Sequence, residues 1–151
     1  MSLELHFADV IDLVSKEVKG LWRKIIFHIK SWFRDEWYKP IPIDELHAWL
    51  EVWKGNVLPK LAYTPETFDC DDFGAYFKAW LVRQSGKNCV GEAIGIVHVP
   101  DIGDIMHEWN IVLTKMHTGK VMVLYVEPQI GQVLKEHSYD GWKYNLMWVI
   151  M

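Results

Sequence analysis

The chain of 151 residues has few cysteines, no long hydrophobic run and no excess of basic residues. Its two cysteines, Cys70 and Cys89, are too few for a disulfide framework, and the charged residues scattered over positions 1–20 are unlike a signal peptide. We therefore expect a reducing, cytoplasmic setting. No apolar run approaches the roughly 18 residues that a membrane-spanning helix needs, so we expect no membrane span.

The formal net charge of −4 gives the chain no global electrostatic reason to bind nucleic acid, so we expect no such partner. The chain is rich in apolar side chains instead, since half of its residues are hydrophobic and nine are tryptophan. This composition excludes disorder as a description of the whole chain and predicts one compact unit with a real core.

Residues 1–40 are predicted to form an N-terminal amphipathic helical segment, either one long helix or two with a break near Gly20. This stripe can pack on the rest of the chain, which we favour, or it can form a homodimer. Basic residues beside Trp22 also permit a helix lying on a membrane surface, the weakest of the three interpretations. Apolar residues recur at spacings of three and four, at Phe7, Ile11, Val14, Val18, Leu21, Ile25 and Trp32.

Residues 41–151 are predicted to form the main domain. Asp44 is the expected cap of a short helix at 45–55, and Asp69 caps a second helix whose apolar positions follow helical spacing. Alternation and β-branched content predict four strands at 93–99, 107–115, 121–128 and 144–151. Helices followed by an antiparallel sheet indicate an α+β fold.

The stretch FDCDDFGAYFKAW, residues 68–80, places Cys70 at the start of the second helix. The helix dipole and free backbone N–H groups favour a thiolate there, whereas the neighbouring carboxylates disfavour it. Thiol chemistry also needs an imidazole that takes the proton and a polar group that orients the imidazole. His107, which opens one predicted strand, and Glu127, which ends the next, are the candidates.

The loop between these two strands decides whether His107 and Glu127 can meet. A three-residue loop at 116–118 makes them direct cross-strand neighbours, and a five-residue loop at 116–120 makes them diagonal neighbours on the same face. A two-residue loop at 118–119 would place them on opposite faces. We discount that loop because Thr118 is poorly suited to the positive φ of a primed turn.

Three motifs together resemble a known family. FDCDDFGAYFKAWL, HEWNIVL and VEPQ follow the order found in the papain-like cysteine protease domain at the C-terminus of a fungal chimeric lectin, the agglutinin C-terminal domain family, within the wider papain and transglutaminase-like group. The similarity spans roughly residues 63–129. It implies a papain-like fold with the nucleophile at the start of a central helix, followed by an antiparallel sheet of about four strands.

The resemblance also implies roles for the candidate residues. Cys70 would be the nucleophile, His107 the general base and Glu127 the residue that orients His107. Trp109 and Gln129 match the family pattern as accessory residues without assigned roles.

The same resemblance implies a bound calcium ion or other divalent cation, because peptidase activity in that family depends on calcium. The implied ligands are Asp69, Asp71 and Asp72, since hard cations prefer carboxylate oxygens. Alternatively, Asp69 only caps the helix, and the other two only suit the positive end of its dipole.

The resulting prediction is a cysteine peptidase or amidase that acts on a peptide or protein through a thioester acyl-enzyme, with no cofactor required for the chemistry itself. Two alternatives stay open: a transglutaminase-like acyltransferase, and a non-catalytic binding or structural module on the same scaffold. The founding lectin of the family carries a sugar-binding β-trefoil before this domain, whereas helices precede it here. Carbohydrate binding is therefore not carried over.

Overall fold

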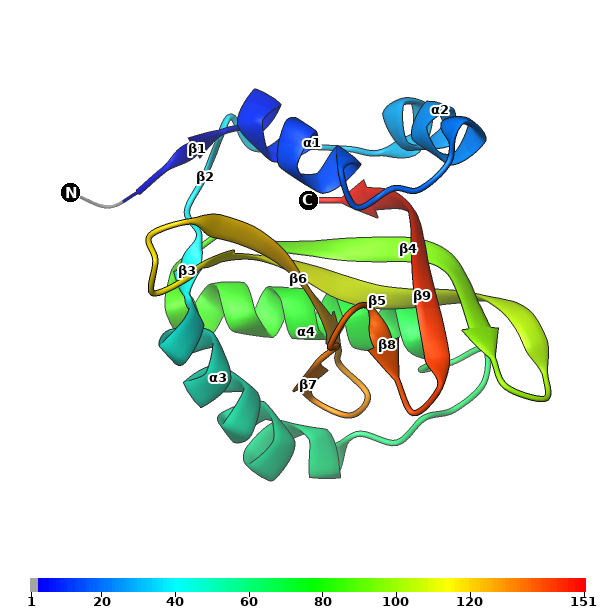
Figure 1. Ribbon diagram of the computed structural model, residues 1–151. Coiled ribbons are helices and arrows are strands. Elements are labelled where there is room, and N and C mark those ends of the chain that lie inside the picture. Colours follow the sequence, from blue (N-terminus) through cyan, green and yellow to red (C-terminus); the bar gives the residue numbers. More distant parts are fainter. Residues whose placement is uncertain (1–2) are drawn as a thin grey trace.

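The computed structural model describes residues 3–151 and is built around one large, curled, mainly antiparallel sheet (Figure 1). Its strands lie in the order β7-β6-β5-β4-β9-β8, with the short β3 added to β5 in parallel, and β1 and β2 form a separate pair. The strands are β1 Leu5–His6, β2 Trp37–Tyr38, β3 Ile41–Pro42, β4 Val90–Val99, β5 Gly103–Lys115, β6 Val121–Glu127, β7 Gln132–Val133, β8 Ser138–Tyr139 and β9 Trp142–Ile150.

Four α-helices occur in this described part: α1 Phe7–Ser15, α2 Leu21–Lys30, α3 Ile43–Val52 and α4 Cys70–Ser85. Gly20 separates α1 from α2 with a φ of +92°, which confirms the predicted break. Asp69 precedes α4 as predicted, and Gly86 ends it in the left-handed conformation. Helix α3 begins earlier than predicted, because Pro42 is its N-cap and Asp44 lies in its first turn. A π-helical turn, Trp53–Val57, and a 3-10 turn, Leu58–Lys60, follow it.

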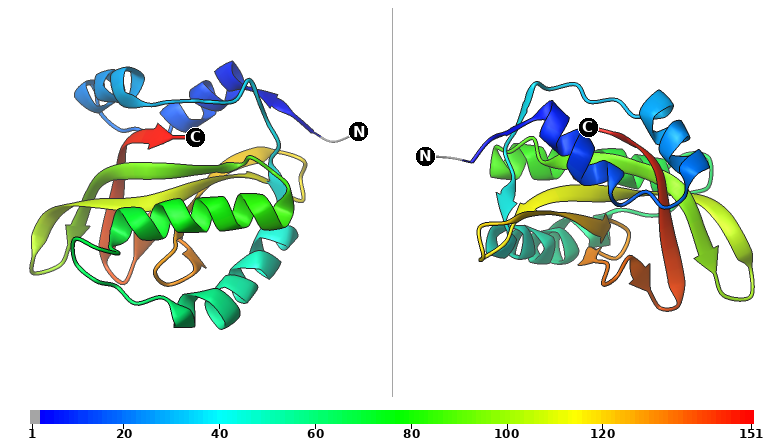
Figure 2. Two further views of the ribbon diagram at one scale, coloured as in Figure 1. Left: turned by 180° about the vertical axis from the view of Figure 1, so that it is seen from behind. Right: turned by 45° about the horizontal axis from the view of Figure 1, so that its top comes forward.

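The helices cover the sheet from two sides. Helix α4 packs against β4 and β5, whereas α1 and α2 lie on the opposite side, with α2 against β9 (Figures 1 and 2). Val10, Val14 and Phe27 from the first two helices are buried in the same core as Phe77 of α4. The N-terminal segment therefore packs on its own chain.

The predicted papain-like fold, with about four strands, is wrong. The described residues form a curled half-barrel of seven strands with four helices. The difference arises because β9, the last strand, inserts beside β4 at the middle of the sheet. Helices α1 and α2 then close one side of the sheet. Pairing between strands so distant in sequence depends on the burial of the whole chain, which local alternation does not encode.

The four main predicted strands are confirmed, and the hairpin between β5 and β6 has the longer of the two loops that keep His107 and Glu127 on one face. Lys115 pairs with Val121, so the loop contains residues 116–120. Gly119 supplies the positive φ of +83° that the loop requires.

The apolar stripe predicted along the N-terminal segment is only partly buried. Val14 and Val18 are in the core, but Leu21 and Trp32 are exposed, because the break at Gly20 changes the direction of the chain. No helix within residues 3–151 combines the length and the apolar character needed to cross a membrane. The first two residues of the predicted segment lie outside the described part, and its division from residues 41–151 stays a prediction.

Candidate functional site

Cys70 is the first residue of α4, and a close helix–strand contact sets its position. Asp69 and Asp72 form a capping box, in which the Asp72 carboxylate accepts the Asp69 backbone N–H at 3.4 Å. One turn later Gly74 lies against Glu108 of β5, and a Cβ at this position would be 2.6 Å from Glu108 Oε1. The missing side chain therefore lets the start of α4 approach the strand that carries His107.

His107 and Glu127 meet on the sheet, as the shared face predicts. His107 Nε2 is 2.8 Å from Glu127 Oε2, and both side chains are buried. Tyr144 on β9 donates its hydroxyl to the same oxygen at 3.1 Å, and the backbone N–H of Gln129 donates to Glu127 Oε1 at 3.2 Å. Glu127 is thus held by three neighbours, which fixes the orientation of the imidazole.

Cys70 and His107 line the same cleft, and each shifts the pKa of the other. Because Nε2 faces Glu127, Nδ1 is the ring nitrogen left for the sulfur. The hydrogen bond from His107 lowers the pKa of Cys70, although partial burial opposes it. Burial disfavours the charged imidazole, but hydrogen bonds to Cys70 and Glu127 outweigh it and raise the pKa of His107 to about 9. The pair therefore favours a thiolate beside an imidazolium.

The two accessory residues lie on either side of this pair. Trp109 is fully buried, and its ring stacks with that of His107 at a centroid distance of 6.3 Å. It therefore supports the imidazole from within the core. Gln129 lines the open side of the site, and its Nε2, which is buried, has no hydrogen-bond partner among residues 3–151.

A cleft opens beside the thiol and imidazole. A second hollow adjoins this cleft, and Tyr139, Asp140 and Tyr144 help to form it. Gln129 and Trp142 line both. The cleft has a volume of about 340 Å³, and its lining residues are Tyr63, Cys70, Ile105, Met106, His107, Gln129 and Trp142. Its walls are mostly apolar and aromatic, with polar groups at the floor, which is the usual character of a ligand site.

The sequence did not reveal Tyr144, Trp142 or Tyr63 as site residues. Tyr144 and Trp142 belong to β9, whose place beside β4 was not predicted, and Tyr63 lies in the loop before α4. The alternation of β9 indicates which of its residues share a face. It carries no signal for which strand lies next to it.

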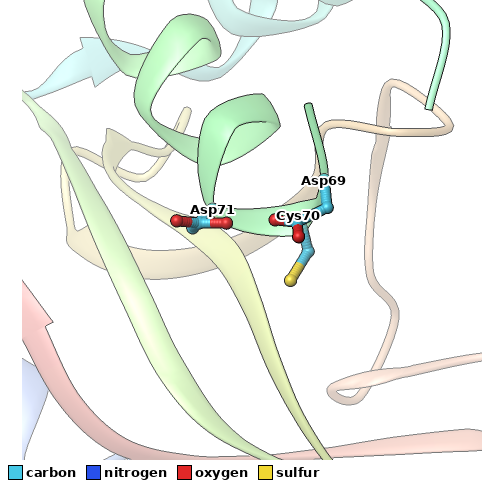
Figure 3. A group of neighbouring side chains, drawn as sticks. All are labelled: Asp69, Cys70 and Asp71. Atoms are coloured by element: carbon cyan, nitrogen blue, oxygen red, sulfur yellow. The ribbon is translucent and has the colours of Figure 1, made fainter. Parts of the chain in front are cut away.

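Acidic side chains gather at the start of α4 (Figure 3). Ligand atoms of Asp69, Cys70 and Asp71 lie within 4.8 Å of one another, and the sulfur projects away from the two carboxylates. A hydrogen bond with Asp69 raises the pKa of Asp71, as expected for adjacent carboxyl groups that share a proton. Asp72, the third predicted ligand, is outside this group because it caps the helix.

Comparison with known proteins finds similarity to an agglutinin family and to solved structures, one of them a lectin. A family model described as Agglutinin C-terminal matches residues 41–133. Two similar solved structures are described as "PSL1a-E64 complex" and "Crystal Structure Analysis of Polyporus squamosus lectin bound to human-type influenza-binding epitope Neu5Aca2-6Galb1-4GlcNAc". Each is 21% identical with a TM-score of 0.66 over 99% of this chain, which spans 51% and 50% of theirs. No curated protein sequence matches the chain.

These findings correct the predicted activity. The family and the solved structure from Polyporus squamosus are named as agglutinin and lectin, which overturns the predicted papain-like cysteine hydrolase and its peptide or protein substrate. The solved structures also share the fold, so the papain-like core is corrected on this ground as well. Cys70, His107 and Glu127 do lie together. Such a polar network does not define an activity, since one scaffold serves unrelated functions.

Proposed function

Because the chain belongs to the agglutinin C-terminal family, we propose that it is a non-catalytic, glycan-binding module whose ligand occupies the cleft beside Cys70 and His107. This is the binding-module alternative, and it reverses the expectation that carbohydrate binding does not carry over. The Polyporus squamosus lectin structure is described as bound to a sialylated glycan. This chain spans about half of that lectin. We therefore do not carry over the particular sugar, and we propose only the ligand class, a glycan.

One observation carries the proposal: a cleft with the aromatic walls of Tyr63 and Trp142 is also lined by the polar side chain of Gln129. An amide side chain that lines a cleft can exchange hydrogen bonds with sugar hydroxyls. Trp142 and the exposed ring of Tyr63 offer flat apolar faces on which the C–H face of a sugar can stack. Both features suit a ligand with polar edges and apolar faces.

In this proposal Cys70, His107 and Glu127 form one polar unit at the floor of the cleft. Glu127 orients His107, and His107 lies beside the Cys70 thiol, so that the ligand meets polar groups in fixed positions. Trp109 keeps the ring in place from behind. The unit thus acts by presenting hydrogen-bonding groups in a set geometry.

Isothermal titration calorimetry of the full chain with the sialylated trisaccharide named for the lectin, followed by a glycan panel, tests the proposal. Trp142→Ala and Gln129→Ala should each weaken binding by about tenfold or more. Trp37→Ala, which removes a half-exposed ring on β2 outside the cleft, is the matched control and should leave affinity unchanged.

Absence of binding to every glycan, or equal binding by both cleft variants, would contradict glycan recognition in this cleft. Turnover of a peptide by the wild-type chain that disappears in Cys70→Ala would overturn the non-catalytic part of the proposal.

We also propose a divalent cation at Asp69 and Asp71. Their adjacent carboxylates offer the oxygen ligands that a hard cation prefers, whereas the Cys70 sulfur does not suit it. Millimolar calcium should raise the melting temperature of the wild-type chain and not that of Asp71→Asn. An equal shift, or none, in both proteins would refute the site.

The cytoplasmic setting is likewise a proposal. Both cysteines are free thiols within the described part of the chain. An accessible thiol of lowered pKa such as Cys70 is easily oxidised, so a reducing compartment would preserve it.

A further inference from the structure

Helix α2 exposes an apolar face that no described part of the chain covers. Leu21, Trp22 and Ile29 are 75%, 77% and 73% exposed. Ile25 and Trp32, the latter just beyond the helix, are also exposed. Contiguous exposed apolar surface of this kind marks an interaction site more often than scattered single residues do.

This face points directly away from the molecule. Phe27 is the buried residue of α2, and it anchors the helix over β9. With about 100° per residue, Leu21, Ile25 and Ile29 lie on the side of the helix opposite Phe27. Figures 1 and 2 show α2 at the outer edge of the structure, with the sheet on one side only. The exposed face is therefore a convex ridge, open to a flat partner.

The segment that contains α2, residues 16–32, has a net charge opposite in sign to that of the whole chain. Helix α2 contains no acidic residue, and the segment 16–32 carries a formal net charge of +4 within a chain of −4. Lys19, Lys24 and His28 are exposed around the ridge. Lys30 lies over the ring of Trp148 at 4.6 Å, which helps to hold the helix in place. The ridge thus presents apolar side chains within a basic surround.

We propose that α2 is an interfacial helix that docks the protein on an anionic lipid surface. Leucine, isoleucine and tryptophan side chains would enter the headgroup region, where tryptophan is favoured, while the lysines meet lipid phosphates. Basic residues near such a surface add electrostatic attraction to the lipid phosphates. A second copy of the chain fits less well, because a two-fold contact between ridges would bring the basic residues of both copies together. This inference is independent of the glycan-binding proposal.

Co-sedimentation of the full chain with vesicles tests the proposal, using phosphatidylcholine alone and phosphatidylcholine mixed with phosphatidylserine. The wild-type chain should bind the mixed vesicles, and added salt should weaken binding. The double variant Trp22→Ser with Ile29→Ser should bind about tenfold less or worse. Lys24→Glu should lose affinity for mixed vesicles only. Ile102→Ser, which removes an equally exposed isoleucine (75%) between β4 and β5, is the matched control and should bind as wild type.

The exposed positions chosen should leave folding intact, and equal melting temperatures would verify this. Equal binding by the wild-type chain and the double variant, or no binding by either, would overturn the proposal. A dimer in analytical ultracentrifugation that the double variant abolishes, without vesicle binding, would assign the ridge to a second copy and overturn it too.

Discussion

The two thiols of the chain have opposite environments. Cys70 is half-buried at a helix start beside His107, which lowers its pKa. Cys89 is fully buried, and burial raises its pKa to about 12. The thiolate is the reactive form of cysteine, so the two residues should differ widely in reactivity.

Iodoacetamide at neutral pH should therefore alkylate Cys70 at least about 100-fold faster than Cys89, as followed by mass spectrometry of the two peptides. His107→Ala should slow the labelling of Cys70 by about tenfold, because the thiolate loses its partner. Labelling in denaturant is the control, since both thiols should then react alike. Equal, slow labelling in the folded chain would show that His107 does not activate Cys70.

Glu108 is a buried carboxyl group whose Oε1 has no hydrogen-bond partner in the described part of the chain. Burial, followed by the charges of Glu92, Asp71 and Cys70, raises its pKa from 4.5 to about 8, although His107 opposes this. The folded chain therefore holds a proton that the unfolded chain releases above about pH 4.5. Stability contributed by this group is present at low pH and is lost as the pH rises toward 8.

Glu108→Gln removes this titration while it conserves the shape of the side chain. Between about pH 5 and pH 8 the wild-type free energy of unfolding should fall relative to the variant, by at most about 1.4 kcal/mol per pH unit. Urea unfolding across this range measures the difference. Glu51→Gln changes a carboxyl group that is 77% exposed and should follow the wild type. Parallel curves for the wild type and Glu108→Gln would show that Glu108 is ionised in the folded chain.

At the scale of elements, the pairing of β4 with β9 fixes the position of Trp109, which packs against His107 of the site. The register between them shifts at Gly95, where a Cβ would meet the carbonyl oxygen of Asn145 and lie 2.8 Å from the ring of Trp109. Trp109 in turn packs against His107. A side chain at residue 95 would displace the Trp109 ring and, through it, the imidazole.

Gly95→Ala should accordingly destabilise the protein by about 2–4 kcal/mol, since neither the backbone oxygen nor the buried ring can move freely. Thermal unfolding measures this loss, and the near-ultraviolet circular dichroism of the aromatic side chains, Trp109 among them, should change with it. Gly55→Ala, where no atom lies within 4 Å, should be close to neutral. A Gly95→Ala protein as stable as Gly55→Ala would mean that β4 and β9 can separate without cost.

For the whole molecule, the N-terminal segment is part of the core. Val10, Val14 and Phe27 are at most 1% exposed, and the backbone of Trp32 exchanges hydrogen bonds with Val149 and Met151 at 2.9 and 2.8 Å. Each large apolar side chain buried in this way contributes roughly 1.5–3 kcal/mol. The first 40 residues should therefore fold together with the rest.

Unfolding of the full chain should be one cooperative transition, and a fragment of residues 41–151 should melt at least about 10 °C lower. Phe27→Ala provides a test that does not require the fragment to fold, with an expected loss of about 3–5 kcal/mol. Ile29→Ala, on the exposed side of the same helix, should be nearly neutral. Two separate transitions, or an unchanged fragment, would establish residues 41–151 as an independent domain.

Local sequence patterns determined many of the helices and strands of this molecule. Capping chemistry at Asp69, helical spacing after it and strand alternation predicted α4 and the four main strands, because these features depend on residues close in sequence. The period of two placed His107 and Glu127 on one face, although two loop lengths stayed open. The same residues led to the wrong activity, since residue type and order do not state what a site binds.

Only the tertiary structure decided the curled sheet, the insertion of β9 beside β4 and the longer of the two loops. These choices depend on which arrangement buries the most apolar surface and pairs the most backbone groups across the whole chain. They bring Tyr144 to Glu127 and Trp142 to the cleft, and they leave the outer face of α2 in contact with solvent. The sequence thus determined the parts of the site, and the packing of distant elements decided what surrounds them.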